Sequence, residues 1–244
     1  MSSLTAIGIE GLPEIEQGAR LGELIAGLTE IEPGDVLVVA QKVVSKAEGR
    51  LRRLSSAIPG AEARKLAAVL GKEPALVELV LEESSEVLRA EGGVLIVETN
   101  HGFVCANAGI DSSNLPEDDM VCLLPEDPDA SARRMRGELP SPVGVVISDS
   151  FGRAWRLGQA EVAIGCAGLQ PLDDWRGRRD AHGRELEATL IAVADEAAAA
   201  ADLVRDKDSG TPVVIIRGLD RFVTSEDGPG AIAMRRPKED DLFR

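Results

Sequence analysis

Short runs of apolar residues alternate along this chain with stretches in which apolar residues recur every three or four positions. Continuous runs are typical of strands buried on both faces, and the longer spacing is typical of helices with one buried face. This mixture predicts an α/β fold (mixed α+β) with mixed β-sheets flanked by helices. The runs predict strands over residues 6–9, 36–40, 94–97, 103–105, 143–147 and 213–216, and a closely packed apolar segment over 162–169. The spacing predicts a helix over 21–28, two helices within 60–83, one over 130–138 that Asp129 caps, and the longest over 186–204.

One stretch, residues 143–159, combines a predicted buried strand with polar chemistry. The strand is followed by Ser148, Asp149 and Ser150, and then by Arg153 and Arg156. A carboxylate that can hold a hard cation therefore lies beside guanidinium groups that can hold phosphate. That combination suits phosphoryl transfer. The alternative is an ordinary junction of strand and loop with a solvated aspartate.

Two further segments offer groups for the same chemistry. Lys42 and Lys46 follow the predicted strand 36–40, at the end where ligands bind in open α/β sheets. Solvated lysines on a surface turn are the other interpretation. The segment 107–114, which reads NAGIDSSN, is dense in oxygen donors and suits a divalent cation and nucleotide hydroxyls. A polar loop that satisfies its own groups would look the same.

Composition and charge narrow the possible partners. The chain has 27 Lys and Arg against 42 Asp and Glu, a net charge of −15, which argues against general nucleic-acid binding. The most basic loop is 173–185, where four arginines indicate an anionic ligand unless they pair with Asp173, Asp174 and Asp180. The three cysteines form no CxxC pair, and neither a signal peptide nor a run of membrane-spanning length is visible. We therefore expect a cytoplasmic protein with no membrane partner.

The sequence carries neither a GxxxxGK[ST] loop nor a GxGxxG turn, so neither a P-loop nor a Rossmann motif is expected. Other blocks carry a resemblance that covers roughly residues 7 to 219. The blocks are QKVVSKAEGR (41–50), CANAGIDSSN (105–114), LLPEDPDASA (123–132), VISDSFGRAWRLGQ (146–159), AIGCAGL (163–169) and RGRRDAHGREL (176–186). In this order and spacing they resemble the coenzyme F420-0:L-glutamate ligases, the γ-glutamyl ligase family of deazaflavin cofactor biosynthesis.

The resemblance implies an activity and its cofactors. It implies a GTP-dependent ligase that joins L-glutamate to coenzyme F420-0 through an acyl phosphate, adds further γ-linked glutamates, and releases GDP and phosphate. Two Mg²⁺ or Mn²⁺ ions per site and K⁺ would assist. It also implies a two-lobed fold, an intertwined homodimer, a ligase domain over residues 1–223 and a C-terminal tail over 224–244. The tail resembles the segment that leads into a flavin-binding reductase domain in some bacterial relatives.

The resemblance also assigns roles to individual residues. Asp111 and Asp149 resemble catalytic ligands of one metal, and Ser150 resembles a contact of a second metal. The nucleotide-binding positions are Leu12, Pro13, Glu14, Ile15, Gln41, Lys42, Lys46, Asn114 and Lys207. Lys207 stands where some relatives carry a metal-binding acid, and a protonated lysine cannot take that role. Beyond the resemblance, we place Arg153 among the catalytic residues, and we expect Arg153, Arg156, Arg176, Arg178 and Arg179 to hold the phosphodiester and carboxylates of the acceptor.

Two other functions fit the same residues. A metal-dependent phosphohydrolase would use Asp111 and Asp149 on water and would turn over GTP without F420-0 or glutamate. A non-catalytic nucleotide-binding protein would bind GTP without turning it over. A substitution of Asp149 would then have no activity to abolish.

Overall fold

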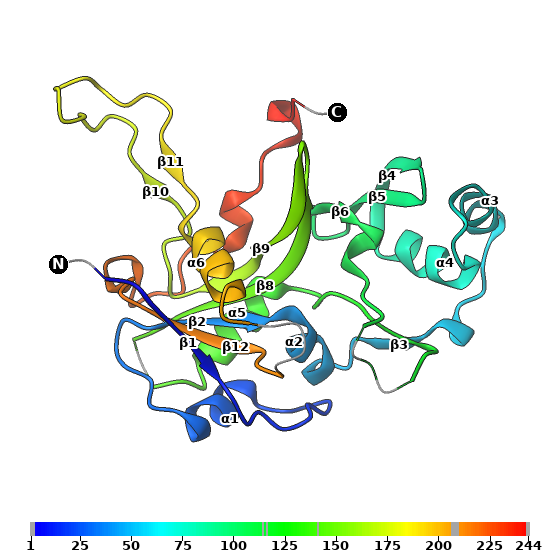
Figure 1. Ribbon diagram of the computed structural model, residues 1–244, viewed down its shortest axis with the longest axis horizontal. Coiled ribbons are helices and arrows are strands. Elements are labelled where there is room, and N and C mark those ends of the chain that lie inside the picture. Colours follow the sequence, from blue (N-terminus) through cyan, green and yellow to red (C-terminus); the bar gives the residue numbers. More distant parts are fainter. Residues whose placement is uncertain (1–2, 114, 116, 141, 206–209, 243–244) are drawn as a thin grey trace.

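A five-stranded sheet forms the centre of the molecule (Figure 1). The computed structural model describes residues 3–113, 115, 117–140, 142–205 and 210–242. The strand order is β1-β12-β2-β8-β9, in which β2 and β8 are parallel and the other neighbours are antiparallel. Its strands are β1 (Thr5–Ile9), β2 (Val36–Ala40), β8 (Gly144–Arg153), β9 (Arg156–Ala167) and β12 (Val213–Arg217).

Helices cover both faces of this sheet. Because side chains alternate between the two faces along each strand, each strand contributes residues to two cores. Leu37 and Ile147 lie in one core together with residues of the helices on that side, and Val38 and Val146 lie in the core under the opposite helix. The first core includes residues of α1 (Leu21–Leu28), α2 (Gln41–Ala47) and α5 (Pro128–Arg136), and the second includes residues of α6 (Val193–Asp202). Within the described residues, no helix has both the length and the apolar character needed to cross a bilayer.

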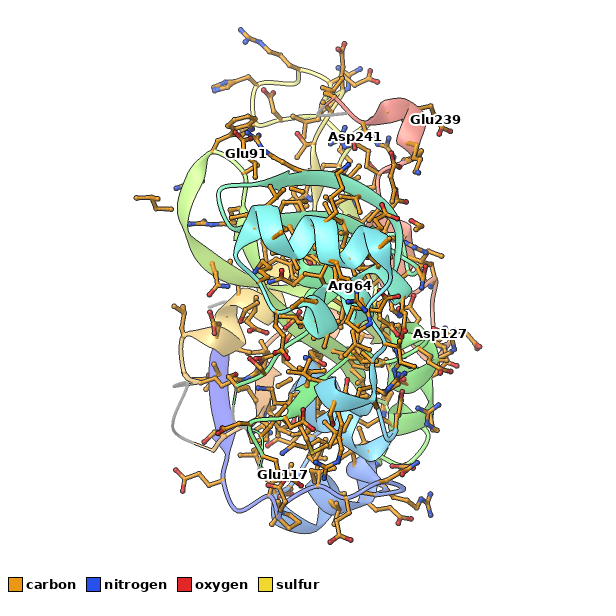
Figure 2. The ribbon with its side chains drawn as sticks, turned by 90° about the vertical axis from the view of Figure 1, so that its right-hand side faces the viewer. Arg64, Glu91, Glu117, Asp127, Glu239 and Asp241 are labelled. Carbon is orange, nitrogen blue, oxygen red and sulfur yellow. The ribbon has the colours of Figure 1, made fainter. Side chains whose placement is uncertain are left out.

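A smaller part of the chain lies to one side of the central sheet (Figure 1). It has its own core, which joins two helices to a three-stranded sheet in the order β4-β5-β6. Seen from the side of α3, this part presents charged side chains at its surface, among them Arg64 and Glu91 (Figure 2). Its elements are α3 (Ala61–Leu70), α4 (Pro74–Glu82), β4 (Ser84–Glu91), β5 (Val94–Thr99) and β6 (Val104–Ala106), and the pair β3 (Leu51–Arg53) and β7 (Met120–Cys122) connects it to the rest. The prediction of a mixed α/β fold with several sheets flanked by helices is confirmed.

Two predicted elements need correction. The helix expected over 186–204 is confined to α6, because residues 190–191 form β11 (Leu190–Ile191), which pairs with β10 (Asp173–Asp174). The helix expected over 130–138 is α5, and its cap is Asp127, whose side chain accepts a hydrogen bond from the amide of Ala130. Asp129 does not cap the helix; its carboxylate accepts hydrogen bonds from amides of β9 and of the C-terminal tail.

Two extensions leave the central body (Figure 1). The hairpin of β8 and β9 continues beyond the sheet to a tip where Trp155 is 86% and Leu157 97% exposed. The arm between β10 and β11, residues 173–191, projects away from α6. Ser148, Asp149 and Ser150 therefore lie within the strand β8, which runs on past them, and the strand does not end before them as the sequence suggested.

Candidate functional site

A cavity of about 450 Å³ opens at the ends of the parallel strands β2 and β8. Open α/β sheets bind ligands at the carboxyl ends of their parallel strands, and this cavity has that position. It brings together most of the residues selected from the sequence. Those that line it are Leu12, Pro13, Glu14, Ile15, Gln41, Lys42, Lys46, Asp111, Asp149 and Ser150.

Two lysines reach the cavity from α2, the helix that begins directly after β2. The sequence pattern did not predict this helix, but its four-residue spacing places Lys42 and Lys46 on one face. The ammonium group of Lys46 lies 2.6 Å from Oε1 of Glu14, which belongs to the segment after β1. The N-terminal segment and α2 thus meet at the cavity, which two cationic side chains line.

Asp111 faces Lys42 from a position just beyond a strained turn. Asn107 and Ala108 have positive φ angles of 51° and 55°, an arrangement that costs free energy for residues other than glycine and that is common at functional sites. Beyond the turn, Asp111 is fixed by backbone hydrogen bonds with Cys122 in both directions. Its Oδ2 lies 2.7 Å from the Lys42 ammonium, and its Oδ1 accepts a hydrogen bond from the amide of Ser113. Burial raises the pKa of Asp111, but the hydrogen bonds from Lys42 and Ser113 outweigh it, so the pKa is lowered and the carboxylate is charged.

Asp149 and Ser150 reach the cavity from β8. This strand pairs in parallel with β2, and Ser148 lies opposite Ala40, the last residue of β2. The residues that follow Ser148 therefore stand next to the start of α2. Both aspartates selected from the sequence line the same cavity although they lie in different parts of the chain.

Glu161 and Arg205 also line the cavity, and the sequence analysis missed both. Ser150 donates a hydrogen bond of 2.5 Å to Oε1 of Glu161, and Arg205 Nη1 lies 3.4 Å from Oε2 of the same carboxylate. Burial lowers the pKa of Arg205, and the charge of Glu161 opposes that shift. The Nε of Arg205 is buried and has no hydrogen-bond partner within the part of the chain that is described. One signal for Glu161 exists in the sequence, because it is a charged residue at the edge of an apolar run.

The predicted arginines lie outside the cavity. Arg153 stands near the tip of the β8–β9 hairpin, where its side chain donates to the carbonyls of Leu157 and Gly158. On the arm, Arg176 pairs with Asp174 at 2.6 Å, and Arg178 lies 3.6 Å from Asp173. Asp173 and Asp174 therefore form the ion pairs within the loop that the sequence left open, whereas Asp180 accepts hydrogen bonds from the amides of His182 and Arg184. Arg156 lies in the same hairpin as Arg153, and Arg179 donates to a carbonyl within the arm, so contacts of these arginines with a substrate stay predictions.

The oxygen donors of the cavity have the chemistry that Mg²⁺ and Mn²⁺ prefer, namely carboxylates and a hydroxyl. The described residues contain no group of three His, Cys, Asp or Glu side chains arranged to hold a metal ion. A cation bound by Asp111 and Asp149, and a second one bound by Ser150, would each need further ligands from water or from a bound nucleotide, as is usual for Mg²⁺. Asn114 and Lys207 lie outside the described residues.

Comparison with known families decides the classification. The family model for F420-0:Gamma-glutamyl ligase matches residues 9–218, which include strands β2, β8, β9 and β12 of the central sheet, only the last residue of β1, and every described residue of the cavity. The chain belongs to the F420-0:gamma-glutamyl ligase family.

Relatives of the F420-0:gamma-glutamyl ligase family match over nearly the full length. The chain is 45% identical, over 251 aligned positions, to the coenzyme F420:L-glutamate ligase of Methanothermobacter thermautotrophicus, with 99% of each chain covered. It is also 45% identical to the protein of that name from Methanopyrus kandleri, with 100% of each covered, and to that from Archaeoglobus fulgidus, with 97% and 94% covered. The resemblance that the sequence blocks indicated is confirmed.

Proposed function

We propose that this protein is a GTP-dependent ligase that joins L-glutamate to coenzyme F420-0 and then adds γ-linked glutamates. Membership of the F420-0:gamma-glutamyl ligase family supports the ligase class and the pathway. The observation that carries the nucleotide-dependent chemistry is the cavity, which gathers Asp111, Asp149, Lys42 and Lys46. Two carboxylates beside two ammonium groups suit a metal-bound triphosphate.

The reaction that we infer proceeds by activation of a carboxylate. A carboxylate is a poor electrophile, so the γ-phosphoryl group of GTP moves to the carboxylate of F420-0, and GDP leaves. The amine of L-glutamate then attacks the acyl phosphate carbon, the amide bond forms, and phosphate leaves. Phosphoryl transfer depends mainly on positioning and charge neutralisation. Lys42 and Lys46 supply cationic groups for the phosphates, and the segment 12–15 forms the opposite wall.

Asp111, Asp149 and Ser150 would hold Mg²⁺ or Mn²⁺, which neutralises phosphate charge when bound. K⁺ is proposed as a further cofactor on the family resemblance alone. The acceptor would be held by Arg153, Arg156, Arg176, Arg178 and Arg179. Because these arginines lie on the two extensions and outside the cavity, we propose that a homodimer brings a partner's extension to it. Sedimentation equilibrium of the full chain tests the dimer, and a purely monomeric protein would exclude it.

The test of the function is mass spectrometry of F420-0 after incubation with the protein, GTP, Mn²⁺ and L-glutamate. We expect a ladder of products separated by one glutamate residue, and its length gives the number of additions. Asp149→Asn should lower the rate by about 100-fold or more, the usual loss when one group that stabilises transition-state charge is removed. GTP turnover that continues without F420-0 and glutamate would instead indicate the phosphohydrolase, and GTP binding without any turnover would indicate a binding protein.

A further inference from the structure

Glu161 and Arg205 are charged residues that the protein buries at the cavity. Their side chains are only 6% and 11% exposed. Charged side chains are almost never buried to this degree unless they are paired, and here each one is the other's partner. Burying such a pair is costly, and in many proteins apolar residues would replace it without loss of stability. A role at the cavity would account for its presence.

The hydrogen bond between Ser150 and Glu161 has a direction that matters. A hydroxyl carries one proton and two lone pairs. Ser150 gives its proton to the Oε1 of Glu161, over 2.5 Å, so its oxygen can act towards other groups only as an acceptor or a ligand. A carboxylate that accepts this bond also makes the hydroxyl oxygen more negative, as the outer partners of metal ligands generally do.

Arg205 fixes the carboxylate that orients Ser150. Its Nη1 lies 3.2 Å from Oγ of Ser148 and 3.4 Å from Oε2 of Glu161, and its Nη2 lies 3.2 Å from the carbonyl of Val38. One guanidinium thus connects β2, β8 and β9 where they border the cavity. With one oxygen of Glu161 held by Arg205, the other stays in place for Ser150.

We propose that Glu161, held by Arg205, is a positioning residue that turns the oxygen of Ser150 towards a divalent cation in the cavity. The inference rests on the proposed function, since that function assigns the cation to Ser150. It adds that the affinity for the cation depends on two residues that do not touch it.

The test measures Mn²⁺ binding directly. The full chain is titrated with Mn²⁺ in the presence of GDP, and electron paramagnetic resonance reports the concentration of free Mn²⁺. Glu161→Gln should weaken Mn²⁺ binding by about 10- to 100-fold, the range seen when an outer partner of a ligand is changed. Ser150→Ala should cause a similar loss, and the double variant should lose no more than the single variants do, because both act through one oxygen. The matched control is Asp195→Asn. The carboxylate of Asp195, on α6, accepts a hydrogen bond from the amide of Ala163, which lies on the same strand as Glu161. This variant should bind Mn²⁺ like the wild type.

Glu161→Gln leaves the buried Arg205 without its ion pair, so thermal unfolding of each variant is measured first. If Glu161→Gln does not fold, the double variant Glu161→Gln/Arg205→Met is tested in its place, because it removes the unpaired charge of Arg205. We expect the same weak Mn²⁺ binding. Wild-type affinity in the folded variant, or losses that simply add in the double variant, would overturn the inference. A wild-type protein that binds no Mn²⁺ would instead contradict the proposed metal site itself.

Discussion

The ammonium group of Lys42 forms an ion pair with Asp111, at 2.7 Å from its Oδ2. Asp111 is also a carboxylate that the proposed function assigns to a divalent cation. A cation can use that oxygen fully only when Lys42 moves, and a nucleotide phosphate is a group that could attract it. We therefore predict that Lys42→Met binds Mn²⁺ about fivefold more tightly than the wild type in the absence of nucleotide. The factor corresponds to the roughly 1 kcal/mol of a partly exposed ion pair.

The same variant should bind GDP more weakly, which calorimetric titration measures. Lys46→Met is the matched control, because Lys46 pairs with Glu14 and not with Asp111. It should weaken GDP binding and gain less affinity for Mn²⁺ than Lys42→Met. Unchanged Mn²⁺ binding in Lys42→Met would show that its ion pair does not compete with the metal.

Three thiols are buried in the native protein. Burial raises the pKa of Cys105 and Cys166 to about 12 and that of Cys122 to about 11, from an ordinary value of 9.0. Since the thiolate is the reactive form, we expect no cysteine to react rapidly with Ellman's reagent at pH 8 in the native protein, and three after denaturation. A fast native reaction would contradict the burial.

These thiols also couple stability to pH. The folded state holds their protons more tightly than the unfolded state, so their contribution to stability is fully present below about pH 9 and is lost as pH rises towards 11 to 12. The free energy of unfolding in urea should therefore fall from pH 8 to pH 10. Cys166→Ala should fall less steeply, because it lacks one of the thiols. If the free energy of unfolding fell equally steeply with pH in both proteins, the Cys166 thiol would not be a cause of the fall.

At the scale of elements, α5 packs closely against β9 at a glycine. A Cβ added at Gly165 would lie 2.4 Å from the backbone carbon and oxygen of Pro128, the first residue of α5. Backbone cannot yield as a flexible side chain can, so Gly165→Ala should lower the free energy of unfolding by about 1 to 3 kcal/mol. Gly152→Ala on β8 is the matched control, since nothing lies within 4 Å of its added Cβ. Urea unfolding of both measures the difference, and equal stabilities would mean that α5 can shift.

The central elements could be predicted from the sequence because burial leaves a clear pattern. Strands β2 and β12 are apolar at nearly every position, since helices cover both faces of the sheet. Strands β4 and β7 were missed because they are partly exposed or only three residues long. The helix expected over 186–204 was too long because the apolar spacing continues into β11, whose state is set by its pairing with β10.

The same division applies to the site. Asp111 and Asp149 could be selected from the sequence because each stands among other oxygen donors. The pairing of Glu161 with Arg205 joins residues 44 positions apart, and a single sequence contains no sign of that contact. The arginines of the arm looked like a binding patch, but the sequence could not show that Arg176 and Arg178 already pair with neighbouring aspartates.

At the scale of the whole molecule, the C-terminal tail contacts both the central body and the smaller part. The Asp129 carboxylate accepts hydrogen bonds from the amides of Ala231 and Ile232, at 2.7 and 3.2 Å, and from that of Cys166 on β9 at 2.8 Å. Further along, Lys238 lies 2.9 Å from Glu98 of β5. The tail therefore bridges the two parts, with the half-buried Asp129 as an anchor at one end and the exposed Lys238 in an ion pair at the other.

These two anchors should differ in strength. Hydrogen bonds to a charged acceptor contribute about 1.5 to 3 kcal/mol each, and amides left without a partner cost more, whereas an exposed ion pair contributes about 1 kcal/mol or less. We predict that Asp129→Ala lowers the melting temperature and accelerates tryptic cleavage after Arg235, while Lys238→Met changes both little. Limited proteolysis followed by mass spectrometry measures the cleavage. If Lys238→Met released the tail as readily as Asp129→Ala, the ion pair of Lys238 would hold the tail as firmly as the hydrogen bonds from Ala231 and Ile232 to Asp129 do.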